Sequence, residues 1–403
     1  MTHALDTVRV DLDRIANISP PLMIRPVADR SPGGLPQVQL PSGHTAVHVT
    51  AYRDVHAILT DTTFARARTN VEDGPSFLPT IMPTEMLLNL DHPEHGRLKG
   101  FVASAYSAAT MARRVPAVRR VLDDRIAELR VRRDQGAADL VRTVLDPLTI
   151  AANVDYLGIP DADIAHFRHL SREMQLGHDT NIEQLLADFW TLYHYIEDLV
   201  ARRRELRPGL ILDLLAARDS VSPPVTDAEY AAILLGSLVG GDQNILSVVT
   251  KIAYVLLARP ELWRYLVDNP RAVPAAVEEL LRLLPLGRIS TFPRVATREI
   301  TLSAGVLYPG EVVYADAHSA NRDPEVFGDP SVIDPNRGGK RHLQFGYGMH
   351  HCMGAAMARM EITEVLRGLL TALPGLRLTV PEEQIPWETG ILVHRPTSLP
   401  VTW

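Results

Sequence analysis

One cysteine, Cys352, stands in a glycine-rich loop of this 403-residue chain. A single thiol excludes an internal disulfide bond and any iron–sulfur cluster held by four protein thiolates, so the fold depends on neither. The loop reads FGYGMHHCMG over residues 345–354 and is followed by the helix-forming run AAMARMEI. Cys352 is therefore expected at, or just before, a helix N-terminus, where the helix dipole and free N–H groups favour a thiolate.

Residue chemistry alone leaves several roles open for Cys352. A thiolate in a glycine loop under the start of a helix suits an axial iron ligand. A lone cysteine is most often a small buried apolar side chain. It could also be a hydrolase nucleophile with His351 as its base, although adjacent residues rarely reach each other in that geometry. A zinc site is disfavoured, because the three potential ligands His350, His351 and Cys352 are consecutive, which does not match the usual spacing of zinc ligands.

Hydrophobic periodicity predicts a mainly helical chain. The clearest helical patterns cover residues 113–133, 138–157, 182–204 and 226–259. After Pro285 short β-like runs appear at 299–302, 312–315 and 376–380, interrupted by one helix at about 355–373. No linker divides the chain, so we predict one domain over residues 1–403. Its β-rich portions are about 36–50, 295–316 and 376–403, and its helical portion is about 52–285 plus 355–373.

Charge and hydropathy restrict the partners and the compartment. The net charge of -7 argues against nucleic acid or an anionic membrane as the main partner. The nearest candidate for a membrane span, residues 231–241, is cut short by Asp242, and about 18 apolar residues are needed. The N-terminus has no apolar stretch typical of a signal peptide. Together with the single cysteine, these features predict a cytoplasmic protein.

Residues 274–284, PAAVEELLRLL, form a second informative segment. The two prolines bound a predicted helix on which Glu279 and Arg282 lie one turn apart. An exposed ion pair of this kind contributes under about 1 kcal/mol. The helix is apolar on most sides, however, and a charged pair in a buried helix should belong to a satisfied network.

The cysteine loop resembles the haem-binding loop F-G-x-G-x-H-x-C-x-G of the cytochrome P450 family at every fixed position. The resemblance extends from about residue 50 to the C-terminal LPVTW. It implies a mainly α fold with small β-sheets, shaped like a triangular prism, with haem b between a long central helix and the cysteine-loop helix. Cys352 is then the iron ligand, and Phe345, Gly346 and Gly354 are haem contacts. It also implies that Glu279, Arg282 and Arg337 form a structural triad.

The same resemblance assigns contacts to the haem propionates, which need cationic or N–H donors. Residues 91–99, DHPEHGRLK, are similar to the family's D-x-P-x-H-x-x-x-R segment. His95 is then expected to meet a propionate. Lys99 stands where an arginine is usual, which replaces a planar fork by a point charge, and Arg97 is expected to compensate. Arg294 and His350 match the other usual contacts.

The predicted long helix begins at the capping box of Thr226 and Glu229 and runs to Arg259, about 50 Å. Gly240 and Gly241 at its middle cost roughly 1 kcal/mol each against alanine. The two glycines are explained structurally by tight packing between helices. They are explained functionally if the helix backbone must come close to a flat macrocycle and bound oxygen. The family usually has small-Gly-x-acid-Thr here. This chain has Gly240-Gly241-Asp242-Gln243-Asn244, so Gly240, Gly241, Gln243 and Asn244 are the catalytic candidates.

Gln243 and Asn244 stand where the family usually has an acid and a threonine, and this difference affects which reaction is expected. Oxygen activation needs two protons, and amides do not pass protons on readily. Asp242 lies about 100° round the helix and is a poor substitute. Either substrate groups or ordered water relay protons in an ordinary hydroxylation, or the substrate loses hydrogen without oxygen insertion. Asparagine here is similar to P450s that cross-link aromatic side chains of peptide natural products, so we favour oxidative coupling, with hydroxylation of a small hydrophobic natural product as the alternative.

The resemblance also predicts the substrate cavity and the partners. The lining is expected from segments 71–87, 174–180, 239–244 and 289–292 and from the last hairpin. The lining candidates are Met82, Met86, Leu88, Val239, Ile289, Thr291, Phe292, Ile391 and Leu392. No strand–GxGxxG–helix unit for a flavin or nicotinamide is present, so a separate ferredoxin and ferredoxin reductase, or a similar donor, should dock on the cysteine side. The other reactants are O2 and a small-molecule or peptide substrate, free or carrier-bound. A non-catalytic haem protein and a cysteine hydrolase are the rival classes.

Overall fold

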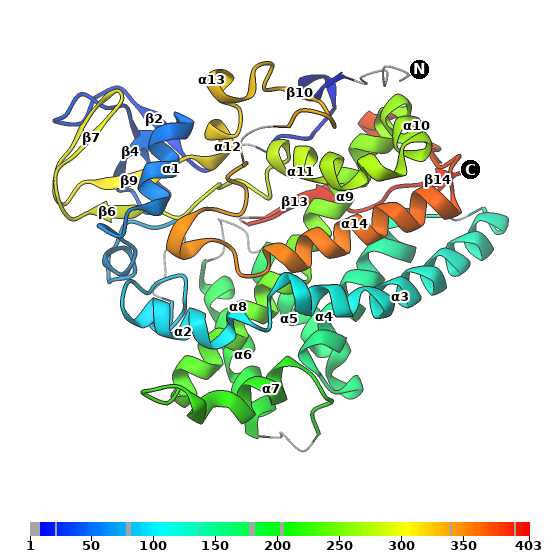
Figure 1. Ribbon diagram of the computed structural model, residues 1–403, viewed down its shortest axis with the longest axis horizontal. Coiled ribbons are helices and arrows are strands. Elements are labelled where there is room, and N and C mark those ends of the chain that lie inside the picture. The colour runs from blue at the N-terminus through cyan, green and yellow to red at the C-terminus, as the bar shows by residue number, and fades with distance from the viewer. Residues whose placement is uncertain are drawn as a thin grey trace.

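The computed structural model describes residues 9–20, 22–77, 82–136, 138–176, 182–201, 205–338, 341–390 and 392–403, without the side chains of residues 174–176, 182, 185, 186 and 239. A β-rich part lies at one end of the molecule, and the rest is mainly helical with a few short strands, among them β13 (His394–Pro396) and β14 (Val401–Thr402) (Figure 1). The predicted class, mainly α with small β-sheets, is confirmed.

The largest sheet joins an early segment of the chain, residues 25–65, to a late one, residues 294–315. Its six strands run in the order β2 (Arg25–Val27), β3 (Gln37–Gln39), β4 (Thr45–Val49), β9 (Val312–Ala315), β6 (Arg294–Ala296) and β5 (Phe64–Ala65). β4 and β9 are parallel, with Val47 opposite Val313. The apolar side chains of this sheet pack against α1 (Tyr52–Thr60) in one hydrophobic cluster. Strands from early and late segments share this core, which supports our proposal of a single domain.

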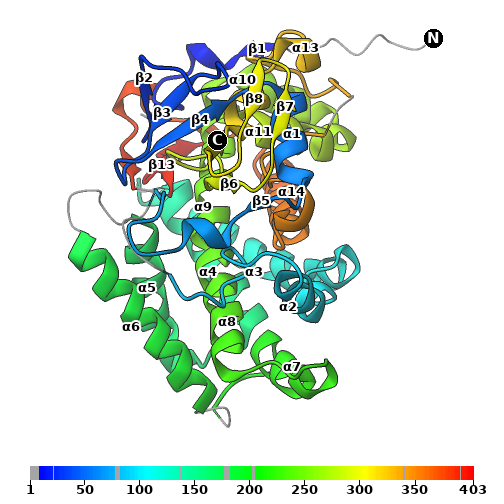
Figure 2. The same cartoon turned by 90° about the vertical axis from the view of Figure 1, so that its left-hand side faces the viewer.

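The remaining strands form four short antiparallel pairs. These pairs are β1 (Val10–Asp11) with β10 (Val332–Ile333), β7 (Ile300–Leu302) with β8 (Gly305–Leu307), β11 (Arg377–Leu378) with β14 (Val401–Thr402), and β12 (Trp387–Thr389) with β13 (His394–Pro396). Figure 2 shows β7 and β8 beside the large sheet, and the hairpin of β12 and β13 below it. That hairpin packs against the long central helix.

The helices are α2 (Glu94–Ala103), α3 (Ala108–Asp134), α4 (Asp146–Leu157), α5 (Ile164–Leu176), α6 (Ile182–Ala201), α7 (Leu210–Ala217), α8 (Asp227–Gly241), α9 (Gln243–Ala258), α10 (Pro260–Asp268), α11 (Val273–Leu283), α12 (Ala317–Ala320), α13 (Pro324–Phe327) and α14 (Ala355–Ala372). α3 runs beside α14, the helix that follows the cysteine loop (Figure 1). The helix predicted at 138–157 begins instead as a π-helical turn at Val141–Leu145 that leads into α4.

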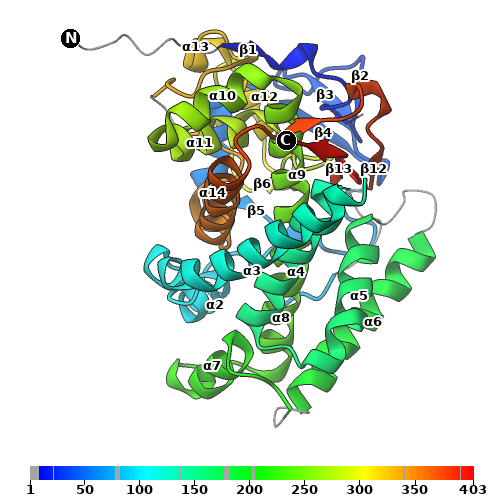
Figure 3. The same cartoon turned by 90° about the vertical axis from the view of Figure 1, so that its right-hand side faces the viewer.

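The long central helix differs from the prediction in one respect. Its capping box is present, because Thr226 and Glu229 bond each other's backbone N–H groups. It is not continuous, however: α8 ends at Gly241, Asp242 has φ -105° and ψ -57°, and α9 continues nearly in line to Ala258 (Figure 3). Two glycines weaken the helix at this point, and side-chain bonds to Asp242 hold the break, as described below.

By length and composition, residues 227–258 could cross a membrane, yet 76% of their most apolar stretch is buried inside the protein. The apolar character of this helix is therefore explained by its central place in the hydrophobic core.

Candidate active site

The cysteine loop is folded tightly at the end of α1. The backbone N–H of Cys352 donates to the carbonyl of Phe345 at 2.8 Å. Gly346 and Gly348 have φ of +66° and +65°, which L side chains rarely adopt. A Cβ at Gly348 would lie 2.4 Å from the carbonyl oxygen of Leu59 in α1. The glycines therefore allow the loop to fold back and pack against α1, with Cys352 three residues before α14.

Two adjoining cavities of about 400 and 420 Å³ meet at Cys352, which lines both. The loop before α14 supplies one wall and the centre of the long helix supplies another. Residues that line both cavities include Leu88, Gly240, Asn244, Thr291, Phe292, His350 and Cys352. Phe345, Gly346 and Gly354 line the first cavity. The structure thus brings together residues that are more than 260 positions apart in the sequence.

Two histidines at the cavity have unused hydrogen-bonding atoms. His95 Nδ1 and His350 Nε2 are buried without a partner among the described residues, and their ring centroids are 4.5 Å apart. Burial lowers the pKa of His95 to about 4 and that of His350 to about 2. Both imidazoles are therefore neutral at pH 7, and each can donate one N–H to a ligand.

Two buried arginines provide positive charge on the same wall. Arg66 and Arg294 line the first cavity and are 4% and 5% exposed. Burial lowers the pKa of Arg66 to about 9 and that of Arg294 to about 10. Neither pairs with a carboxylate among the described residues, because the nearby Asp91 accepts from the backbone N–H groups of Arg66 and Ala67. Buried unpaired cations are strongly disfavoured, so this wall requires an anionic ligand.

These groups fit an iron porphyrin with two propionates. Cys352 would bind the iron, and Arg66, His95, Arg294 and His350 would hold the carboxylates. Burial raises the pKa of the Cys352 thiol, whereas N–H groups of Gly354 and Ala355 and the charge of Lys99 lower it. A bound metal ion displaces the thiol proton and makes the thiolate the stable form.

Lys99 and Arg97 do not both serve as predicted. Lys99 lines the second cavity, but its ammonium group donates to the carbonyls of Met349 and His351 and so holds the cysteine loop. Arg97 lines neither cavity. It forms an ion pair with Glu229 at the start of α8, so the expectation that it compensates at a propionate is corrected. The buried cation that the sequence reasoning missed is Arg66.

The candidate residues of the long helix point in different directions. Gly240 and Asn244 line both cavities and Gly241 lines the first. The amide oxygen of Asn244 is buried and has no partner among the described residues. Gln243 lines neither cavity. Arg395 donates to its side-chain oxygen at 2.8 Å, so the expectation that Gln243 faces the reaction centre is corrected.

Gln243 belongs to a closed chain of polar contacts that we call the polar ring: Ser171, Arg172, Asp242, Gln243, Glu388 and Arg395. Ser171 Oγ donates to Asp242 at 2.6 Å, and Gln243 Nε2 donates to Asp242 at 2.9 Å. Arg395 and Arg172 donate to the two oxygens of Glu388 at 2.5 and 2.7 Å. The ring joins α5, the break in the long helix, and the hairpin of β12 and β13.

Glu361 on α14 is a second group that the sequence reasoning missed. Its side chain is buried, and Oε2 has no partner among the described residues. Burial raises its pKa to about 8, with Asp242 adding to the rise. This carboxyl is therefore protonated at pH 7 and can release a proton near the centre of the long helix. The signal in the sequence was an acid between two apolar residues, Met360 and Ile362, although α14 also carries other charged side chains.

The predicted substrate-pocket residues largely line the cavities. Met82, Met86, Leu88, Ile289, Thr291, Phe292 and Leu392 line the second cavity. Ile391 and the side chain of Val239 lie outside the described residues, as does most of the predicted segment 174–180. Phe189 of α6 and Ile233 of α8 also line this cavity, and no local pattern predicted them.

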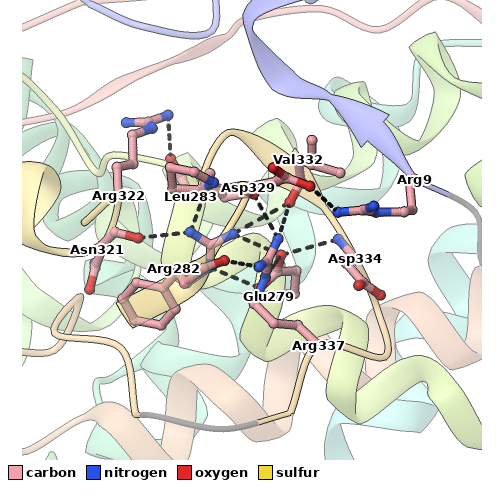
Figure 4. A network of polar contacts seen from close by, with 12 residues as sticks. Arg9, Glu279, Arg282, Leu283, Asn321, Arg322, Asp329, Val332, Asp334 and Arg337 are labelled. Atoms are coloured by element: carbon pink, nitrogen blue, oxygen red, sulfur yellow. Dashed lines mark hydrogen bonds and ion pairs between the residues drawn. The ribbon is translucent and has the colours of Figure 1, made fainter. Parts of the chain in front are cut away.

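The side chains of the triad residues converge on Glu279 (Figure 4). Glu279 accepts from Arg282 at 2.8 and 2.9 Å and from Arg337 at 2.9 Å. Arg282 also donates to the carbonyl of Asn321 at 2.7 Å, and Arg337 to that of Val332 at 2.8 Å. This network joins α11 to the segment that leads into the cysteine loop and satisfies the buried charges.

Comparison with known proteins places the chain in a family. The family model described as Cytochrome P450 matches residues 271–396. Nocardicin C N-oxygenase of Nocardia uniformis subsp. tsuyamanensis is 39% identical over 369 residues, which cover 91% of this chain and 92% of that protein. Mycinamicin IV hydroxylase/epoxidase of Micromonospora griseorubida is 36% identical over 368 residues, again 91% and 92%.

The fold agrees as well. The crystal structure of cytochrome P450mel 107F1, described with biaryl coupling reactivity, superposes with a TM-score of 0.83 at 34% identity over 89% of this chain and 91% of that one. Membership of the family supplies haem with a cysteine thiolate ligand, and the chain has one cysteine, in the family's loop. The chain therefore belongs to the cytochrome P450 family, alongside its bacterial relatives, and is a haem-thiolate oxidoreductase of the monooxygenase type.

Proposed function

We propose that this P450 couples aromatic rings oxidatively in a peptide natural product. The observation that carries the proposal is the centre of the long helix. Asn244 stands in the cavity where the family has an alcohol, and Gln243 is bonded to Arg395 outside the cavity. Neither amide passes protons readily. Because coupling and hydroxylation both need two protons for oxygen activation, those protons must come from water or from the substrate itself, and a phenolic substrate brings hydroxyl groups of its own into the cavity.

The chemistry balances without a further oxidant. Two aromatic rings each lose one hydrogen from O–H or C–H, and one C–C or C–O bond forms between them. O2 is the oxidant, two electrons arrive from a ferredoxin, and both oxygen atoms leave as water. When bound, the haem supplies the activated oxygen for the hydrogen abstraction. Around it, Arg66, His95, Arg294 and His350 hold its carboxylates, and the apolar walls exclude water.

The cavity and the related proteins support an aromatic substrate. Met82, Met86, Phe189 and Phe292 make the second cavity largely apolar, and flexible methionines adapt to flat rings. P450mel, with a similar fold, is described with biaryl coupling reactivity, whereas nocardicin C N-oxygenase is named for oxygen insertion.

Hydroxylation is the second candidate, and Glu361 favours it. A protonated carboxyl beside the long helix can replace the missing acid of the relay. The name mycinamicin IV hydroxylase/epoxidase shows that a relative of this chain inserts oxygen.

Electron delivery is proposed to come from a separate ferredoxin and its reductase, as is general for bacterial P450s, in a cytoplasmic compartment that keeps Cys352 reduced. Lys99, Arg341 and Arg359 lie close enough to His351 to lower its pKa, after the larger effect of burial. Arg359 is paired with Glu278, so Lys99 and Arg341 supply the positive charge on the cysteine side. An acidic ferredoxin would complement this surface.

The deciding experiment is mass spectrometry of the product formed by the haem-loaded enzyme with ferredoxin, reductase and a tyrosine-containing cyclic dipeptide. Loss of two hydrogens supports coupling, whereas gain of one oxygen atom refutes coupling and supports hydroxylation. The prerequisite, thiolate ligation of the haem iron by Cys352, is checked with the reduced carbon-monoxide complex. Its red-shifted Soret band should be absent in Cys352→Ala. Retention of that band in the variant would contradict thiolate ligation by Cys352.

A further inference from the structure

We infer that Lys99 controls how readily the enzyme takes up an electron, because it holds an uncompensated positive charge at the cysteine loop. Lys99 bonds the backbone of the loop and acts on the iron through Cys352, so it is a positioning residue. The inference goes beyond the proposed reaction and holds for coupling and hydroxylation alike, since both begin with an electron from a separate donor.

The first support is the set of contacts that Lys99 makes. Its Nζ donates to the carbonyl oxygen of His351 at 3.0 Å and also to that of Met349. His351 immediately precedes Cys352, so the ammonium group is bonded to the backbone next to the iron ligand. An arginine would present a wide planar fork here, whereas the compact ammonium group of a lysine is shared between two carbonyls of one loop.

The charge of Lys99 is not cancelled by a neighbouring acid. No carboxylate pairs with it among the residues that the structure describes, and both of its acceptors are neutral carbonyls. Burial lowers the pKa of Lys99, whereas the negative charge of the Cys352 thiolate raises it. The two carbonyl acceptors also favour the charged form. Lys99 is therefore a half-buried cation whose negative neighbour is the sulfur itself.

A second cation that acts on Cys352 differs in this respect. Burial raises the pKa of the Cys352 thiol, and both Lys99 and Arg359 lower it. The guanidinium group of Arg359, however, donates to both carboxylate oxygens of Glu278, at 2.6 and 3.0 Å. A paired cation and anion largely cancel at a distance, so Arg359 should have little influence on the charge of the sulfur. The effect of Lys99 has no such compensation.

A fixed positive charge at this position favours the reduced state of the site. Reduction adds one electron to the iron, supplied by the separate donor, and no bond to Lys99 forms or breaks. The added negative charge is stabilised by a nearby cation, more strongly in the protein than in bulk water. The cation also draws electron density from the sulfur and so tunes the iron through its ligand. Both effects raise the reduction potential.

The test measures the reduction potential of the haem-loaded enzyme by spectroelectrochemistry, without substrate. Lys99→Met keeps most of the side-chain length and removes the charge. The equilibrium constant for reduction should fall about tenfold, the lower end of the effect of a residue behind a metal ligand, or about 59 mV for one electron. Lys99→Arg keeps the charge and should restore most of the loss. In Lys99→Met the sulfur donates more electron density, so the C–O stretching frequency of the reduced carbon-monoxide complex should fall.

Two matched variants separate the charge from the stability of the loop. Arg359→Gln removes a cation that is already paired and should change the potential little. Glu278→Gln leaves Arg359 without its counter-ion and should raise the potential, opposite to Lys99→Met. The inference is overturned if Lys99→Met keeps the wild-type potential with full haem content, if Lys99→Arg is as low as Lys99→Met, or if Arg359→Gln lowers the potential equally. None of these outcomes depends on whether the product gains oxygen or loses hydrogen.

Discussion

Replacing Glu279 by glutamine should lower the free energy of unfolding by about 3–5 kcal/mol, the usual effect of removing one member of a buried ion pair. The Glu279 side chain is 5% exposed and that of Arg282 is 3% exposed. The carboxylate accepts from Arg282, from Arg337 and from the backbone N–H of Asp334. Glutamine keeps the shape of the side chain but carries no charge, so the guanidinium groups of Arg282 and Arg337 lose their counter-ion. One of the N–H groups that now donate to the carboxylate would then face the NH2 group of the glutamine instead of an acceptor.

The adjacent Glu278→Gln provides a matched control. Its carboxylate pairs with Arg359 at 2.6 Å and with His342 at 3.2 Å, but it is 43% exposed, so solvent screening limits the expected effect to about 1 kcal/mol. Urea unfolding followed by tryptophan fluorescence gives the free energies, and the Soret band reports haem retention. Glu279→Gln should also release haem earlier, because Arg337 lies in the segment that leads into the cysteine loop. Equally small effects of the two substitutions would refute our account of the triad.

Three further predictions concern other parts of the molecule. Burial raises the pKa of Glu361 in the folded protein to about 8. Between about pH 5 and 8 the folded protein therefore keeps a proton that this side chain releases in the unfolded chain. The free energy of unfolding should fall over this range, by at most about 1.4 kcal/mol per pH unit. Glu361→Gln should flatten that slope in urea titrations, and an unchanged slope would contradict the burial effect. A Cβ at Gly241 would lie 2.2 Å from Oδ1 of Asn153, so Gly241→Ala should lower the melting temperature. Adding Asn153→Ala to that variant should restore part of the loss. If it restores nothing, the clash is relieved elsewhere. Reduction by ferredoxin, measured by stopped flow, should slow as salt rises, whereas a salt-independent rate would rule out electrostatic docking.

Short motifs predicted the parts of the site that are local in the sequence. The glycines of the cysteine loop fix its backbone, and the spacing of Glu279 and Arg282 places both on one helix face. The proline-bounded helix 274–284 and the strand 312–315 were predicted within one residue of their ends, because their apolar patterns continue in the buried core. The capping box of the long helix was recognised because Thr226 and Glu229 are three residues apart in the sequence.

Contacts across the fold determined the remainder, and no local pattern encodes them. Arg66 reaches the cavity because β5 pairs with β6 and so brings it near Arg294. The direction of Gln243 depends on Arg395, which lies 152 residues further along the chain. Arg97 has the right spacing for the cavity, yet Glu229 on another helix attracts it. Such competition between possible partners is decided by tertiary packing, which pattern reading does not resolve.

The polar ring has a consequence for ligand traffic. Two consecutive residues of α5, Ser171 and Arg172, are its attachment points, one in the protein interior and one at the surface. If α5 swings outward to admit a molecule, it must break both hydrogen bonds in the same movement, or else pull Asp242 and with it the helix break beside Asn244. An outward movement of α5 would therefore disturb the backbone next to Asn244 unless both contacts break.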